Sequence, residues 1–370
     1  MSFRSPRESA MFNERFDPET RAAVQEEENY PLNEDEEIIF QRTMKFEEDK
    51  PTMDDFNIPE KQRQRDQAWL SEKKRQKDAF KPKRGRILEY ALTTQIESSD
   101  WLGSNCQTFE TTEFDDRKGT DLVFEWQEQE NGHPIHLAVD VTVGESQECI
   151  ATKEKNIKED LESGKLAWVK YFKSPHNPNI EGAIRHIPKV IIALSREGTG
   201  SLCKDIVNKS PGEMIDNPEQ LLILEQIKQQ MIDQIEYILG LLLEEIALHV
   251  NQLNKEGKDQ LIELVTQSSQ LSNHPETIKQ VIVTLQNQKE MLRQLNAWNK
   301  ISMHFDNIGK HQTILELAEN LIKEKSDLLE PQVVRQAADL KKTNIVLGRV
   351  KERQSSWHLP YRLQNLAEAA

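Results

Sequence analysis

The chain has 370 residues, a formal net charge of −15, and 36% hydrophobic against 30% charged residues. This length allows two or three domains, and the low apolar share predicts that part of the chain stays outside a packed core. The three cysteines, Cys106, Cys149 and Cys203, are far apart and form no CxxC pair, which argues against a disulfide framework and against a zinc site.

Targeting and membrane signals are weak throughout the sequence. No apolar run follows a basic start, so we expect no signal peptide and a cytoplasmic location. The most apolar stretch, residues 221–250, is interrupted by charges, so we expect no membrane span.

The first 60 residues predict a mostly disordered acidic tail. They hold 17 acidic and 7 basic residues and are punctuated by five prolines. A short helix over Glu34–Glu48 could still dock through its apolar residues. The tail is either a solubilising segment, which we favour, or a decoy that covers a basic surface until nucleic acid displaces it.

Residues 61–84 form a basic segment that continues to Arg86. The stretch Lys61–Arg86 holds 11 bases and 3 acids, with Trp69 and Phe80 interleaved. A helix from Pro59 to Phe80 fits this pattern, and Pro82 ends it. The segment either binds nucleic acid through several phosphates or is a solvated helix that pairs with the acidic parts of the chain.

Residues 85–211 alternate between helix and strand signals and predict an α/β domain. A helical run with Glu89 comes first, and the clearest strands then flank a turn at Asn131-Gly132. In chain order, the expected elements are a helix over Arg86–Ile96, strands over Gln107–Phe114, Thr120–Trp126 and Ile135–Val143, a helix over Thr152–Ser163, a strand or helix end over Leu166–Phe172, and a strand over Pro188–Ser195.

Two aspartates stand out in the predicted hairpin. Successive side chains on a strand alternate between faces, so Asp140 lies among apolar neighbours in the middle of a strand that reads as buried. A lone carboxylate there costs several kcal/mol unless it is paired or binds a metal, on the scale known for buried ions. Asp121 opens the neighbouring strand, and two carboxylates on adjacent strands can converge on Mg²⁺.

This arrangement resembles the PD-(D/E)XK nuclease superfamily, over about Lys83–Leu202. In that family an acidic residue opens one strand, an acid-x-Lys triplet follows on the next, and a Glu often comes from the preceding helix. Asp121 and the triplet Asp140-Val141-Thr142 match this order, and Glu89 lies on the preceding helix. The resemblance implies a restriction-endonuclease-like core with Mg²⁺ (or Mn²⁺) held by Glu89, Asp121 and Asp140.

The sequence departs from the family at one position. Thr142 stands where the family usually has a lysine, which puts catalysis in doubt more than fold. Some relatives supply this lysine from the following helix, where the candidates here are Lys153, Lys155 and Lys158. Thr142, Lys153 and Lys155 are therefore kept as catalytic candidates beside the three acids.

A glycine-containing stretch, residues 196–201, follows the last predicted strand. Gly198 and Gly200 could approach a phosphate ahead of a helix. A lone GxG is a weak signal, and a plain strand-to-helix loop is the favoured interpretation.

Residues 212–370 carry almost no strand signal and predict an all-α helical bundle. The first helix, from Asn217 to about Val250, has an apolar surface so wide that it needs neighbours on several sides. A second subunit could complete the bundle, which makes a homo-oligomer possible. Further helices are expected over Asp259–Leu271, Pro275–Phe305, Gln312–Leu329 and Pro331–Arg353.

The sequence thus predicts an α+β protein and leaves two functions open. The first is a metal-dependent nuclease that hydrolyses phosphodiester bonds, with the basic segment attracting nucleic acid to an otherwise acidic body. The second is a non-catalytic interaction or assembly protein, in which a degenerate nuclease fold is joined to a helical partner-binding module. The missing lysine at position 142 and the large helical half favour the second.

Overall fold

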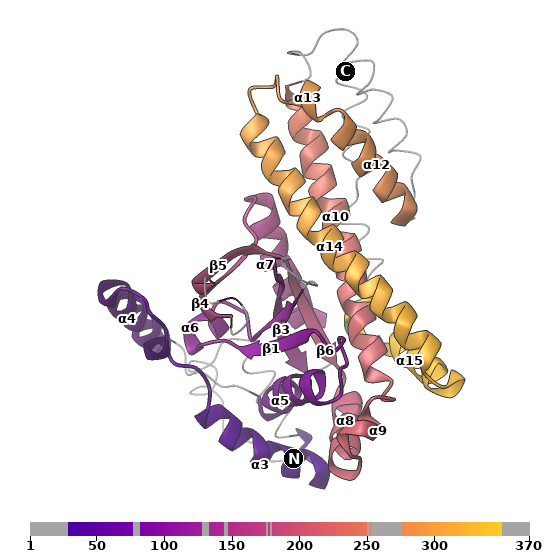
Figure 1. Cartoon of the computed structure of the whole chain (residues 1–370). Coiled ribbons are helices and arrows are strands. Elements are labelled where there is room, and N and C mark those ends of the chain that lie inside the picture. The colour runs from indigo at the N-terminus through magenta and orange to yellow at the C-terminus, as the bar shows by residue number, and fades with distance from the viewer. Residues whose placement is uncertain are drawn as a thin grey trace, which may run out of the picture.

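A four-stranded mixed sheet in the order β1-β2-β3-β6 organises the first half of the chain (Figure 1). Strands β1, β2 and β3 are antiparallel neighbours, and β6 runs parallel to β3. The computed structural model describes residues 29–76, 82–127, 133–143, 147–174, 177, 180–249, 252 and 275–349. The strands of this sheet are β1 (Cys106–Glu110), β2 (Leu122–Trp126), β3 (Ile135–Val143) and β6 (Lys189–Leu194).

The predicted α+β class and hairpin are confirmed, because β2 and β3 pair in antiparallel register. The predicted turn at Asn131-Gly132 lies outside the described residues. The parallel pairing of β3 with β6 needs a crossover, and helix α7 (Gln147–Glu162) supplies it. Residues 167–173 form strand β4 (Ala167–Lys173), which pairs with a strand that the sequence did not predict, β5 (Glu181–Ile187).

The two faces of the sheet have different neighbours. Leu122 and Val139 pack with helix α5 (Lys83–Ser98) in the large core cluster. Val123 and Ala138 alternate to the other face, where they pack against residues of β4 and β5. This alternation decides which polar side chains of the same strands can meet.

The segment before α5 is folded over residues 29–76, so the prediction of a mostly disordered tail through residue 60 is wrong for residues 29–60. The helix expected within it is present as α3 (Glu34–Glu48), capped by reciprocal bonds between Asn33 and Glu36. Ile39 is fully buried, and Glu36 forms a buried ion pair of 2.6 Å with Arg84 of α5. Apolar docking and this ion pair hold the segment against α5. A 3₁₀ turn (Met53–Asp55) and helix α4 (Glu60–Gln76) follow.

The residues 196–201, expected as a loop, instead begin helix α8 (Arg196–Asn208). Ser195 caps this helix, since its Oγ accepts a bond from the amide of Gly198. Gly198 and Gly200 are therefore helical residues. The short helix α9 (Pro211–Met214) leads to the helical half.

Long helices dominate the remaining chain, but their limits differ from those predicted. The expected helix over Pro275–Phe305 is broken near residues 288–297, and a single helix then runs through Gly309 to residue 328. The predicted helix Asp259–Leu271 lies outside the described residues. The helices are α10 (Glu219–Leu248), α12 (Pro275–Asn287), α13 (Lys289–Leu292), α14 (Trp298–Leu328), α15 (Pro331–Thr343) and α16 (Ile345–Gly348).

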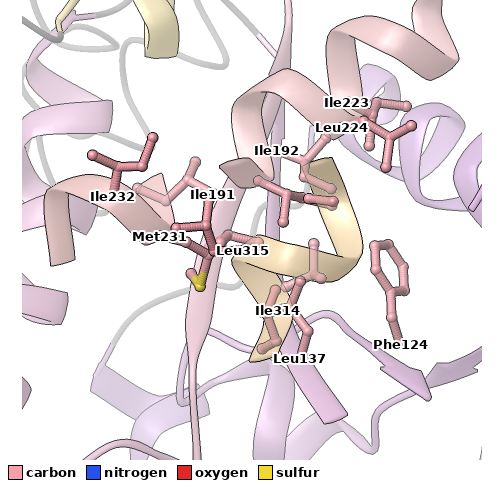
Figure 2. Close-up of a cluster of buried hydrophobic side chains, with 14 of the residues drawn as sticks. Phe124, Leu137, Ile191, Ile192, Ile223, Leu224, Met231, Ile232, Ile314 and Leu315 are labelled. Atoms are coloured by element: carbon pink, nitrogen blue, oxygen red, sulfur yellow. The ribbon is translucent and has the colours of Figure 1, made fainter. Parts of the chain in front are cut away.

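The helical half and the sheet share one hydrophobic core. Helices α10 and α14 run side by side along the β6 side of the sheet (Figure 1). Figure 2 shows side chains from β2, β3, β6, α10 and α14 gathered in one cluster. The labelled members are Phe124, Leu137, Ile191, Ile192, Ile223, Leu224, Met231, Ile232, Ile314 and Leu315.

A row of glutamines on α10 covers the outer edge of β6. Gln230 accepts from the amide of Ile191 at 2.9 Å and donates to its carbonyl at 2.7 Å. Gln226 accepts from the amide of Ala193, and Gln234 donates to the carbonyl of Lys189. These residues recur every fourth position, so one helix face supplies hydrogen bonds that a fifth strand would otherwise make.

Candidate active site

Asp121 and Asp140 lie opposite each other at the junction of β2 and β3. Leu122 pairs with Val139, and the amide of Asp121 donates to the carbonyl of Val139 at 2.9 Å. The Oδ2 of Asp121 accepts from the amide of Val141 at 2.7 Å, which fixes this carboxylate across the two strands. The carboxylate of Asp140 is 8% exposed. The two predicted aspartates are thus neighbours on one face of the sheet.

Two lysines complete this cluster. The ammonium of Lys153, on α7, forms an ion pair with Asp140 Oδ1 and lies 3.5 Å from the carbonyl of Val141. The ammonium of Lys189, on β6, lies 3.4 Å from Asp140 Oδ2. Burial alone would lower the pKa of Lys153, but the charges of Asp140 and Asp121 outweigh it and raise that pKa above its usual range. Lys153 is therefore a protonated donor.

Gly119 forms one wall of the cluster. Its φ of +81° lies in the left-handed region that favours glycine. A Cβ at this position would come within 2.9 Å of Lys189 Nζ and 3.3 Å of Asp140 Oδ2. The turn before β2 therefore lies close to the charged groups, and any other residue here would be strained at this φ and would have to displace the ammonium of Lys189.

Glu89 belongs to a different cluster. Its Oε2 lies 3.3 Å from Lys50 Nζ, and the same ammonium lies 3.5 Å from Glu110 and 3.1 Å from Glu47. The reason is strand alternation: Glu110 points to the α5 face of the sheet, whereas Asp121 and Asp140 point to the face that α7 covers. Burial raises the pKa of Glu110 to about 7, although the charge of Lys50 opposes this shift.

The other catalytic candidates are also placed. Lys155 is 72% exposed and pairs with Glu159 on its own helix, so it points away from the aspartates. Thr142 continues β3 beyond Asp140, and its Oγ1 lies 3.9 Å from the sulfur of Cys149. Thr142, Lys153 and Lys155 are the three further catalytic candidates. Of these, only Lys153 contacts a predicted acid in the described structure.

Another carboxylate on the same strands is fully buried and has protein partners on both oxygens. Glu125 Oε2 lies 2.8 Å from His136 Nε2, and its Oε1 accepts from the hydroxyl of Ser174 at 2.9 Å. These hydrogen bonds join β2, β3 and the end of β4, so we assign Glu125 a structural role.

Sequence reasoning missed Lys189 and Gly119. Lys189 opens a strand that pairs with β3, and its register partner is Ala138, two residues before Asp140 on the same face. Only the pairing of β6 with β3 reveals this, and no local pattern in the sequence indicates it.

Within the described residues, no group of three or more His, Cys, Asp or Glu side chains is arranged to hold a metal ion. Within the same part of the chain, no helix is long and apolar enough to cross a membrane. Comparisons with protein-family models, with curated proteins and with solved structures gave no match to this chain.

Proposed function

We propose that this protein is a metal-dependent phosphodiesterase that cleaves nucleic acid at Asp121, Asp140 and Lys153. The observation that carries the proposal is the meeting of two in-register aspartates with a largely buried lysine from the following helix. This trio corresponds to the two acids and the displaced lysine that the PD-(D/E)XK resemblance implies. Glu89, which pairs with Lys50, is not required in this arrangement.

The donor set fits a hard divalent cation. Mg²⁺ in phosphoryl-transfer sites is held by one or two carboxylates together with water and substrate phosphate, so Asp121 and Asp140 would be its protein ligands in this proposal. When bound, such an ion polarises the scissile phosphate and lowers the pKa of an attacking water. Mn²⁺ has the same preference for oxygen ligands.

The protein's own groups have separate roles in this proposal. Lys153 donates hydrogen bonds and holds positive charge beside Asp140, where negative charge on a phosphate would increase in the transition state. Lys189 offers a second ammonium on the other oxygen of Asp140. Gly119 lets the turn before β2 lie close to the ammonium of Lys189 and the carboxylate of Asp140.

A non-catalytic assembly role is the alternative, and one observation favours it. Lys153 and Lys189 balance the charges of Asp121 and Asp140 without any added ion. Such a network would stabilise the packing of α7 and β6 against β3, and the helical half would then bind the partner. In that case the aspartates would affect stability alone.

The deciding experiment measures metal binding and cleavage together on the full chain. Isothermal titration with Mg²⁺ and Mn²⁺, and cleavage of labelled DNA and RNA, should give signals that Asp140→Asn and Asp121→Asn abolish. Asp306→Asn removes an exposed carboxylate on α14 and is the matched control. Glu89→Gln should retain metal binding.

Folding of each variant is checked by circular dichroism before these comparisons are made. Metal binding and cleavage that persist in a folded Asp140→Asn protein would refute the proposed site. A folded wild type without metal binding or cleavage would instead favour the assembly role.

A further inference from the structure

The basic helix α4 is anchored to the body of the protein. Asp66 is buried and accepts from the hydroxyl of Tyr171 at 2.6 Å, while Lys170 Nζ lies 2.6 Å from the same carboxylate. Trp69 packs edge-on against Phe114, with ring centroids 5.3 Å apart. A helix held by a buried acid and an aromatic contact has a defined exposed face.

A basic stripe runs beside this anchor, and we define it as Lys61, Arg65, the half-buried Trp69, Lys73 and Lys118. The four helical members recur every fourth residue and therefore form one row along α4. Lys61, Arg65 and Lys73 are exposed. The exposed Lys118 precedes β2 in the α/β part of the protein, and its ammonium lies 4.4 Å from the ring centroid of Trp69.

The basic stripe leads to the candidate active site. Lys118 directly precedes Gly119, where an added Cβ would lie 2.9 Å from Lys189 Nζ and 3.3 Å from Asp140 Oδ2. Lys118, which packs on Trp69 of α4, thus connects the row of positive charge to the turn that approaches Lys189. In a chain with a net charge of −15, this row is a local exception that can attract a polyanion.

An exposed tryptophan extends the same surface beyond the anchor. Trp168, on β4, is 44% exposed, and the guanidinium of Arg185 on β5 lies over its ring at 5.1 Å. Lys170 joins this pair to the helix, because its ammonium is 5.5 Å from the Trp168 ring and also contacts Asp66. A half-exposed indole beside a guanidinium is a surface on which a nucleic-acid base can stack.

We propose that the basic stripe and the Trp168–Arg185 pair together bind single-stranded nucleic acid and guide its backbone to the site at Gly119. The guiding role rests on the proposed function, but the binding itself does not. Phosphates would contact Lys61, Arg65 and Lys73, and a base would stack at Trp168.

Burial of the site favours a single strand over a duplex. The side chains of Asp140 and Lys153 are 8% and 19% exposed, so the reacting phosphate must reach below the surface. A single strand can bend one phosphate inward, whereas a stacked duplex keeps its bases paired and cannot stack one on Trp168. Basic residues interleaved with aromatic ones are the combination that single-strand binders use.

The test is fluorescence anisotropy with a labelled oligonucleotide and the full chain, in EDTA so that no cleavage occurs. Single strands of DNA and of RNA are compared with a duplex of the same sequence across a range of KCl concentrations. Lys61→Glu/Arg65→Glu/Lys73→Glu should weaken single-strand binding at least 10-fold. It should also lower the slope of log affinity against log salt by about 2, at ~0.7 per lost phosphate contact.

Each variant has a matched control in the helical half. Lys323→Glu/Lys341→Glu/Lys342→Glu makes the same change in net charge at exposed positions of α14 and α15 and should have less than half of this effect. Trp168→Ala should weaken binding about 5- to 150-fold, the range of one base-stacking contact. Trp298→Ala removes another tryptophan that has an arginine beside its ring and should leave affinity unchanged.

The outcomes separate this proposal from the catalytic one. Tighter binding to the duplex than to both single strands, or equal losses in the basic-stripe variant and its control, would overturn the binding surface. Loss of cleavage without loss of binding in Asp140→Asn would leave the surface intact and concern the proposed function alone.

Discussion

Replacing Lys153 by methionine tests whether the ion pair at the candidate site is formed. Methionine keeps an unbranched apolar stem but removes the ammonium from Asp140, a side chain that is 8% exposed. Breaking a buried pair by removing one partner costs about 3–5 kcal/mol. Because Lys189 remains 3.4 Å from Asp140 and Lys153 is itself 19% exposed, we expect a loss of about 2–3 kcal/mol, at or below the lower limit of that range.

The measurement is a double-mutant cycle, in which circular dichroism monitors the urea denaturation of each variant. Asp140→Asn/Lys153→Met removes both charges, so its loss of stability should be smaller than the sum of the two single losses by about 1–3 kcal/mol. The same double variant should be folded yet unable to cleave nucleic acid. Strictly additive losses would refute the ion pair, and cleavage by the folded double variant would refute the proposed roles of both residues.

Three further predictions concern the surroundings of the site. Gln230→Leu leaves the buried amide and carbonyl of Ile191 without their partner and should lower the free energy of unfolding by about 2–4 kcal/mol in thermal or urea unfolding. Gln280→Leu makes the same change at an exposed position of α12 and should cost less than about 0.5 kcal/mol. Burial raises the pKa of Glu110 from 4.5 to about 7 in the folded protein. Between these pH values the folded protein keeps a proton that the unfolded chain has lost, so the free energy of unfolding falls as the pH rises through this window. Glu110→Gln should remove this slope, so its stability relative to wild type should improve from pH 4.5 to pH 8 by on the order of 2–3 kcal/mol, and a parallel pH profile of the two proteins would contradict the assignment. Gly119→Ala should lose cleavage activity, and the strain of its positive φ should lower the free energy of unfolding by about 1–2 kcal/mol. Gly182→Ala, also at positive φ but with open space around it, should lose stability without losing activity.

Local sequence patterns determined the elements that carry the site. Alternation of apolar residues predicted the hairpin of β2 and β3, and it placed Asp121 and Asp140 on neighbouring strands before any contact was known. The wide apolar surface of the helix after Asn217 predicted that α10 would be buried on several sides, and most of its residues are. These predictions succeeded because the periods of strands and helices are properties of the local backbone.

Tertiary packing decided which charged groups meet. Lys153 and Lys155 are two residues apart on α7, about 200° around the helix, so only the docking of that helix makes one a partner of Asp140 and leaves the other in solvent. Glu89 has the expected place on α5, but this helix covers the opposite face of the sheet. Lys189 joins the site only because β6 pairs with β3, and the glutamines of α10 bind β6 only because no other strand of the described residues pairs with that edge. Each of these contacts joins residues far apart in the chain, and only the assembled fold brings them together, because local periodicity does not extend beyond a single helix or strand.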